Sequence, residues 1–258
     1  MKLQFLIFLS IVAVTTSTNT TEKLRRVRRI VGGEPTEISH VPYLVNIRKK
    51  GKMHCGGSLI TPRCVISAAH CVQQFKPADF IIHGGVTYLQ EDINSRRVQR
   101  IFIPQDFTLR SLNRDVAIFQ LAGQLKGANM KYIKLSNIEL ELGDMVTVSG
   151  WGLTSETAKK PSNQMRSVDV RVLSQTACRE LYKNFRNVTN FMFCASIPGR
   201  KDSCLADSGG PVVYNGELVG IVSWARGREC GRIESPGVYV KVKAVKPWLE
   251  NVISQHCL

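Results

Sequence analysis

The sequence predicts an all-β fold, a barrel or a sandwich, followed by one C-terminal α-helix. From Ile30 onward the apolar residues come in short β-branched runs separated by turn residues, as is typical of antiparallel strands. Helical periodicity is clear only near the end of the chain, where apolar residues at 245, 248, 249, 252 and 253 share one face and Pro247 suits a first helical turn. The polar, glycine-containing stretch 122–129 is a candidate junction between two halves. The expected strands are residues 44–47, 65–67, 80–82, 98–103, 116–121, 145–149, 168–172, 212–214, 218–222 and 238–242.

The 258 residues, with 43% apolar content, suit one large or two small folded domains. At the N-terminus, Lys2 is followed by an apolar run at 3–14 and then by small residues, which predicts a secretory signal peptide at 1–17. The run is too short for a membrane span, which needs about 20 apolar residues. Eight cysteines without a Cys-x-x-Cys pair favour an oxidising compartment, so we expect a secreted, extracellular protein.

The polar segment 18–29 ends in the basic run RRVRR at 25–29. Such a run is either a cleavage site or a solvated tail. The formal net charge of the chain is +15, and because residues 1–29 hold six basic residues and one acidic residue, the remainder keeps +10.

Three segments place residues suited to nucleophilic catalysis. His70 follows an expected strand and is next to Cys71, which can anchor it. Asp115 stands at the start of an apolar strand, where a half-buried carboxylate needs a partner with a proton to donate, although a turn-capping Asp is the alternative. Ser208 lies among small residues that allow a tight backbone with several N–H groups aimed at one point.

These segments and others in the same order resemble the trypsin-like serine proteases of the chymotrypsin family, from Ile30 to the C-terminus. The resemblance implies two six-stranded antiparallel β-barrels, at about 30–128 and 129–244, with the active site between them and a C-terminal α-helix at about 245–256. It also implies a zymogen with an activation propeptide at 18–29 and a peptidase domain at 30–258. The matching blocks are IVGG at 30–33, AAHC at 68–71, DVA at 115–117, GWG at 150–152, DSGGP at 207–211, SW at 223–224 and PGVY at 236–239.

The resemblance assigns a role to each residue of the candidate triad, which we define as His70, Asp115 and Ser208. A serine hydroxyl is a poor nucleophile until a base removes its proton, and a histidine side chain can take that proton and pass it to the leaving amine. Asp115 would hold the imidazole in the correct tautomer and stabilise the imidazolium. The backbone N–H groups of Ala206 and Ser208 would form the oxyanion hole.

Activation is implied by the same resemblance. Cleavage after Arg29 would create a new ammonium group on Ile30, which the family buries against the Asp before the nucleophile, here Asp207. The basic run before Ile30 suits either a trypsin-like activator or a furin-like convertase.

The primary substrate pocket is also implied by the resemblance. Asp202 lies six residues before Ser208, at the position that forms the base of the pocket in trypsin-like members, and a carboxylate there selects Arg or Lys. Ser203 could add a hydroxyl and Gly237 would keep the far wall open. Ser223, Trp224 and Ala225 would complete the walls, and the methyl of Ala225 narrows the mouth because trypsin-like members have glycine there.

Ala206 is the main departure from the family, which has glycine at this oxyanion position. An L-residue in the left-handed region costs about 1–2 kcal/mol, whereas losing one oxyanion donor costs about 2.7–4 kcal/mol in the transition state. If the Ile30–Asp207 pair holds the loop, we expect a working but slower enzyme. The segment 225–229 is also two residues longer than in trypsin, so Arg226, Arg228 and Arg232 either favour acidic substrate residues or are solvated.

The disulfide pairing follows from the resemblance, because eight cysteines allow 105 connectivities. It implies Cys55 with Cys71, Cys178 with Cys194, and Cys204 with Cys230. Cys64 and Cys257 remain. Since the family packs its terminal helix on the first barrel, we expect these two to bridge, with an intermolecular disulfide through Cys257 as the alternative.

We expect no cofactor and no metal. The segment that corresponds to trypsin's calcium loop opens with GGVT at 84–87 and offers no early carboxylate, so Glu91 and Asp92 are expected to be solvated. Asn187 is in a glycosylation sequon, as is Asn19 in the leader. The basic loops at 48–52 and 96–97 are expected to be solvated, and without a nucleic-acid motif or interleaved aromatic residues we expect no nucleic-acid partner.

The expected function is a secreted serine endopeptidase that cuts after Arg or Lys and is activated by cleavage after Arg29. Its partners would be protein or peptide substrates, an activating protease and serine protease inhibitors. We expect a monomer without a transmembrane segment. The alternative is a catalytically weak or inactive homologue that acts as a binding or regulatory module, for which Ala206 is the only argument. An esterase or lipase is not supported because the Gly-x-Ser-x-Gly elbow is missing around Ser208.

Overall fold

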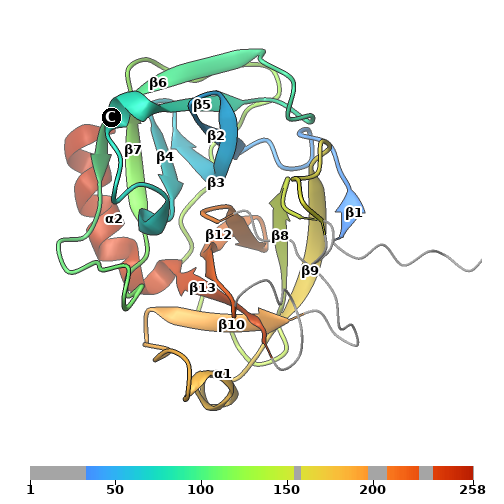
Figure 1. Cartoon of the computed structure of the whole chain (residues 1–258), viewed down its shortest axis with the longest axis vertical. Helices are drawn as coiled ribbons and strands as arrows, with labels where there is room; N and C mark the ends of the chain where they lie inside the picture. The colour runs from blue at the N-terminus through green and yellow to red at the C-terminus, as the bar shows by residue number, and fades with distance from the viewer. Residues whose placement is uncertain (1–32, 154–157, 197–207, 227–234, 258) are drawn as a thin grey trace, which may run out of the picture.

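The structure is a computed structural model of the chain and describes residues 33–153, 158–196, 208–226 and 235–257. Among them, two sets of antiparallel strands form two closed sheets, which Figure 1 shows in blue to green and in yellow to red. The elements are β1 (Glu34–Pro35), β2 (Leu44–Lys49), β3 (Lys52–Thr61), β4 (Cys64–Ser67), η1 (Ala69–Cys71), η2 (Pro77–Asp79), β5 (Phe80–Gly84), β6 (Asn94–Phe102), β7 (Ala117–Leu121), β8 (Met145–Gly150), β9 (Arg166–Val172), α1 (Gln175–Tyr182), β10 (Met192–Ser196), β11 (Pro211–Tyr214), β12 (Glu217–Trp224), β13 (Gly237–Lys241) and α2 (Val242–His256).

The first barrel closes in the strand order β2-β3-β4-β7-β6-β5. Its interior is filled by large apolar side chains that are fully buried, such as Ile47, Leu59 and Phe119. Gly57 in β3 is required by this packing, because a Cβ atom there would lie 2.8 Å from Cγ1 of Val65 on the neighbouring strand. The close approach of the two strands therefore explains a glycine in the middle of a strand.

The second barrel closes in the order β8-β9-β10-β13-β12-β11, because β8 pairs with both β9 and β11. The short strand β1 adds to its outer edge by pairing with β9. Stacked rings of Phe193 and Tyr239, with centroids 5.2 Å apart, fill its interior together with Val146 and Val212. The prediction of two six-stranded antiparallel barrels with a C-terminal helix is therefore confirmed. The chain passes from one barrel to the other between Leu121 and Met145.

The sequence did not predict β1, β3, β10, α1 or the short helices η1 and η2. Strands β3 and β10 lack long β-branched runs, since β3 reads KMHCGGSLIT and β10 reads MFCAS. Helix α1 is only eight residues long and buries only Cys178 and Tyr182, one turn apart. Ser174 is its N-cap, with a side chain that accepts a hydrogen bond from the N–H of Ala177, so capping was the signal that could have found this helix.

Helix α2 begins at Val242, earlier than the predicted start at about 245, and it ends at His256. Pro247 therefore lies inside the helix and not in its first turn, which corrects that part of the prediction. The buried face of α2 includes Val245 and Leu249, which belong to the same hydrophobic cluster as the first-barrel interior. The N-cap residue, Lys241, makes no side-chain cap hydrogen bond. The start of the helix is therefore set by its packing against an apolar surface.

Candidate active site

Asp115 is placed at the entrance to β7 by an unusual backbone. Arg114, the residue before it, has a φ of 53°, which is in the left-handed region and is uncommon for a residue other than glycine. The carboxylate of Asp115 is completely buried. Its Oδ1 accepts a hydrogen bond from the backbone N–H of His70 at 2.8 Å, and its Oδ2 accepts one from the hydroxyl of Ser223 at 2.6 Å. A buried charge satisfied by several donors is the arrangement that folding tolerates.

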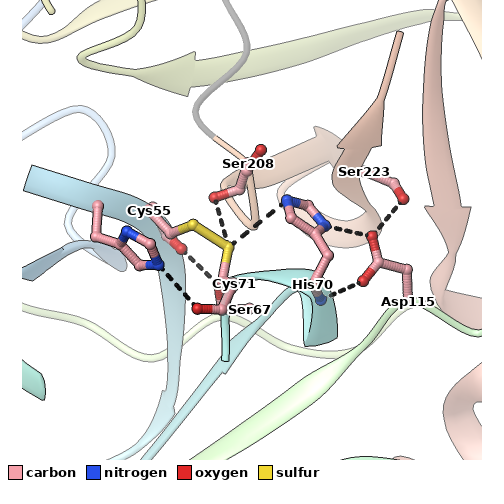
Figure 2. The surroundings of a disulfide bond; sticks show 9 residues. Cys55, Ser67, His70, Cys71, Asp115, Ser208 and Ser223 are labelled. Carbon is pink, nitrogen blue, oxygen red and sulfur yellow. Dashed lines mark hydrogen bonds and ion pairs between the residues drawn. A yellow bond between two sulfur atoms is a disulfide. The ribbon is translucent and has the colours of Figure 1, made fainter. Parts of the chain in front are cut away.

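His70 lies in η1, immediately after β4, and its side chain is 22% exposed. Its Nδ1 is 2.6 Å from Oδ2 of Asp115, as Figure 2 shows. An ionised carboxylate can only accept, so the proton of a neutral His70 belongs on Nδ1. Nε2 is then left with a lone pair that can accept a proton, and it lies 3.8 Å from Sγ of Cys71. The pair is therefore arranged as a base held by a buried acceptor.

Ser208 is held between the two barrels. Its carbonyl oxygen accepts a hydrogen bond from Gly56 N–H of β3 at 2.9 Å, and the next residue, Gly209, donates its N–H to Val222 of β12 at 2.8 Å. Figure 2 places Ser208 above the Cys55–Cys71 disulfide and next to the ring of His70. The candidate triad is therefore gathered in one place. The structure forms no hydrogen bond between the Ser208 hydroxyl and His70, both of which are within the described residues.

The rim of the predicted pocket is only partly described. Ser223 is buried and its hydroxyl is directed to Asp115, a role that the sequence analysis did not foresee. Trp224, Ala225 and Gly237 are half-buried. A Cβ atom on Gly237 would lie 2.5 Å from the hydroxyl oxygen of Tyr239, whose pKa is raised by complete burial.

Several predicted site residues lie outside the described residues. These are Arg29, Ile30, Asp202, Ser203, Ala206 and Asp207, together with Arg228, Arg232 and the pair Cys204 and Cys230. Their predicted roles in activation, in the oxyanion hole and in substrate selection remain predictions.

Three disulfides join the pairs that the sequence analysis expected. They are Cys55–Cys71, Cys178–Cys194 and Cys64–Cys257. The first ties η1, and with it His70, to β3. Cys64 and Cys257 have Cα atoms 5.6 Å apart, within the separation that a disulfide can span, and their bond fastens the end of α2 to the first barrel. The alternative of an intermolecular disulfide through Cys257 is therefore not realised.

His54 is a second imidazole next to the candidate triad that the sequence analysis missed. Its Nε2 is 2.8 Å from the carbonyl oxygen of Cys71. Burial lowers the pKa of His54, and the nearby charges of Lys49 and His70 lower it further, against the effect of the Cys71 carbonyl. A neutral His54 does not repel a positive charge that forms on His70.

The described residues include one cluster with the composition of a metal site, formed by Cys55, His70 and Cys71. Its two cysteines are joined in a disulfide, so they have no thiolates to offer a metal ion. This cluster does not fit a metal.

The loop after β5 is held by an arginine. Arg48 Nη2 donates to the carbonyl oxygens of Leu89 at 2.5 Å and Glu91 at 2.8 Å. Oε2 of Glu91 accepts hydrogen bonds from the N–H groups of Thr87 and Tyr88. The expectation that Glu91 and Arg48 are solvated is therefore wrong, because both are half-buried and bonded within the loop. Asp92 lies 3.0 Å from Nδ1 of His83, and its side chain is 62% exposed, as expected. The guanidinium of Arg48 therefore places a positive charge where the carbonyl oxygens of Leu89 and Glu91 meet.

We expect the loop to stay intact when metal ions are chelated, but to be destabilised when the guanidinium of Arg48 is removed. EDTA should leave the melting temperature unchanged, and Arg48→Ala should lower the free energy of unfolding by about 2 kcal/mol because two charge-assisted hydrogen bonds are lost. Both are measured by thermal and urea unfolding, with Lys52→Ala, an exposed position in the same hairpin, as the control. A drop in melting temperature with EDTA would show that a metal ion, and not Arg48, closes the loop.

Two further features concern the surface. No helix within the described residues is both long enough and apolar enough to span a membrane. The sequon residue Asn187 is exposed, while the hydroxyl of Thr189 is 2.8 Å from the side-chain oxygen of Asn113 in the loop before Asp115.

Comparisons with known proteins identify the family. The sequence model of the family described as Trypsin matches residues 30–249. The chain is 39% identical over 230 residues to the vitellin-degrading protease of Bombyx mori, covering 88% of this chain and 86% of that protein. It is 36% identical over 223 residues to seminase of Drosophila melanogaster, covering 86% of this chain and 80% of that protein. The solved structure of neuropsin, a serine protease of mouse brain, superposes with a TM-score of 0.79 at 27% identity and covers 87% of this chain and 100% of that one. The chain therefore belongs to the trypsin family of serine proteases.

Proposed function

We propose that this protein is a secreted serine endopeptidase that hydrolyses peptide bonds after Arg or Lys. The observation that best supports the proposal is the pair formed by Asp115 and His70, with Nδ1 and Oδ2 only 2.6 Å apart. This pair leaves Nε2 of His70 as a base on the side of the ring where Ser208 lies. Two of the three donors to the buried Asp115 carboxylate belong to His70, so this carboxylate fixes the orientation of the ring.

The proposed reaction follows from these positions. Nε2 of His70 takes the proton from the Ser208 hydroxyl while the oxygen attacks the carbonyl carbon of the substrate. The same proton then passes to the leaving amine, and water attacks the acyl-enzyme with His70 again as the base. The N–H groups of Ala206 and Ser208 would receive the oxyanion in both steps.

Specificity for Arg and Lys rests on Asp202 and Ser203, which we assign to the base of the pocket by the family resemblance. The walls are assigned on the same basis to Ser223, Trp224, Ala225 and Gly237. Tyr239 fills the space beside Gly237, because a Cβ atom there would lie 2.5 Å from the tyrosine oxygen, so this position has room for glycine alone.

We also propose that the chain is made as a precursor, with a signal peptide at 1–17, a propeptide at 18–29 and a peptidase domain at 30–258. The amine of Ile30 exists only after the bond behind Arg29 is cut, and its partner would be Asp207. Asn187 is the proposed glycan attachment site.

Labelling tests the proposal. The purified chain is cut at Arg29 with immobilised trypsin, freed of it, and treated with a fluorophosphonate probe and with peptide amides ending in Arg, Lys, Phe or Ala. We expect the label on Ser208 and hydrolysis only after Arg and Lys, with no labelling of the Arg29→Gln or Ser208→Ala chains. A cut chain that neither takes the label nor cleaves any Arg or Lys amide overturns the proposal. That result would support the alternative of a binding or regulatory module.

Ala206 has a separate test. We expect Ala206→Gly to raise kcat of the cut enzyme about tenfold, because glycine adopts the left-handed backbone without the cost of about 1–2 kcal/mol that alanine pays. The measurement is kcat on one Arg amide, and unchanged turnover would show that Ala206 is not strained.

A further inference from the structure

A wall of three aromatic rings borders the candidate triad on the Asp115 side. Trp224 directly follows Ser223, which is bonded to Asp115. Its ring centroid lies 4.8 Å from that of Tyr182 and 6.1 Å from that of Phe185. Tyr182 ends helix α1, and Phe185, in the turn that follows, is 50% exposed. We call Tyr182, Phe185 and Trp224 the aromatic wall.

Arg186 joins this wall to the loop that carries Asp115. Its guanidinium carbon lies 5.4 Å from the centroid of the Trp224 ring. Its Nη1 donates to the carbonyl oxygen of Arg110 at 2.5 Å and lies 3.4 Å from that of Leu109. Arg186 therefore bridges two segments that are 76 residues apart in the sequence, and it places a permanent positive charge against the ring that follows Ser223.

Arg226 lies behind the same wall. Its guanidinium carbon is 5.5 Å from the ring centroid of Tyr182 and 5.4 Å from that of Phe185, and its Nη2 donates to the carbonyl of Leu181. Two buried N–H groups of this region, Nε of Arg226 and Nε1 of Trp224, have no hydrogen-bond partner among the residues that the structure describes. Arg226 is therefore half-buried and packed against the wall.

The two guanidiniums have no acidic partner in the part of the chain that the structure describes. Within the described ranges, neither Arg186 nor Arg226 forms an ion pair, whereas nearby Lys183 is paired with Glu180 and Arg114 with Asp106. Two unpaired cations on an aromatic surface, where the effective dielectric constant is lower than in water, attract an anion more strongly than solvated arginines do.

The wall lies beside one of the two directions that a bound chain can take from Ser208. β11 pairs with β12 only up to Ile221, so the β12 segment that ends at Trp224 extends beyond β11. From a carbonyl at Ser208, a substrate chain can run past the Cys55–Cys71 disulfide on one side or over Trp224, next to Ser223, on the other (Figure 2).

We propose that Arg186, supported by Arg226, is a specificity-determining residue that selects an acidic side chain two to four residues before the scissile bond. This inference rests on the proposed function, because it presumes a substrate in the cleft. The guanidinium keeps donors beyond those used on the Arg110 and Leu109 carbonyls, and a carboxylate can accept from two of them at once.

Peptide amides with Arg at the cleavage site test this proposal. The second, third or fourth residue before the scissile bond is either Glu or Gln, and kcat/KM of each pair gives a Glu-to-Gln ratio. We expect a ratio of about three to ten at one of these positions in low salt, which falls towards one in 0.5 M NaCl as the charges are screened. A matched set with Glu or Gln after the scissile bond should show no such preference.

Two variants assign the effect to Arg186. Arg186→Gln should bring the ratio to about one, and Arg186→Glu should make Lys preferred over Gln at the same position. Lys183→Gln removes the same charge three residues away, from a side chain paired with Glu180, and should keep the ratio of the parent enzyme. If no Arg peptide is cut, the proposed function fails. If Arg peptides are cut with a ratio of one, or if Arg186→Gln keeps the preference, the inference about Arg186 is overturned.

Discussion

Replacing Asp115 with asparagine is expected to lower kcat about 10⁴-fold on an Arg amide, with little change in KM. The Asp115 carboxylate receives donors from the backbone and Nδ1 of His70 and from the Ser223 hydroxyl. An asparagine offers one acceptor oxygen and turns an NH₂ group toward the ring, so the proton of His70 moves to Nε2. That tautomer cannot take the proton from Ser208.

Ser223→Ala is the matched comparison for Asp115→Asn. It removes one donor to Oδ2 at 2.6 Å but keeps the carboxylate, so we expect a loss of about tenfold in kcat. Near-ultraviolet circular dichroism of both variants checks that the fold is kept. If Asp115→Asn retains more than a tenth of the parent kcat, Asp115 does not orient the base.

Gly209→Ala is expected to destabilise the chain by about 3 kcal/mol or more and to abolish labelling of the neighbouring Ser208. Gly209 has a φ of 81°, which costs an L-residue about 1–2 kcal/mol. Its Cβ would also lie 1.9 Å from Oγ of Ser67 and 2.7 Å from the carbonyl oxygen of Gly56. Because these atoms belong to the first-barrel strands that hold the turn, relief of the overlap must displace Ser208.

Gly216→Ala separates the two costs. Gly216 has nearly the same φ, 76°, but a Cβ atom there would have no heavy atom within 4 Å. The alanine variant at 216 therefore carries only the cost of the left-handed backbone. We expect its loss of unfolding free energy in urea to be smaller by about 1–3 kcal/mol, and Ser208 to be labelled as in the parent. Equal losses in the two variants would mean that the turn at Gly209 can move without cost.

The sequence predicted most of the strands because a half-buried strand needs β-branched apolar residues close together. The prediction missed elements that are stabilised by contacts with residues distant in the sequence. β3 keeps Gly57 because Val65 of the next strand packs against it, and α1 rests on two buried residues and a capping serine. Tertiary contacts, and not local composition, support these elements.

What the sequence by itself determined is the chemistry: the motifs around His70, Asp115 and Ser208 carry the residue types that acyl transfer needs, and they occur in family order. Only the tertiary structure decided which atoms meet. Ser223 reaches Asp115 across 108 residues, Gly56 N–H binds the Ser208 carbonyl, and Arg186 lies on Trp224. A sequence motif determines which chemical groups lie within a few residues of one another. Hydrogen bonds between the barrels depend on strand register and on barrel closure, and no local sequence pattern encodes either of these.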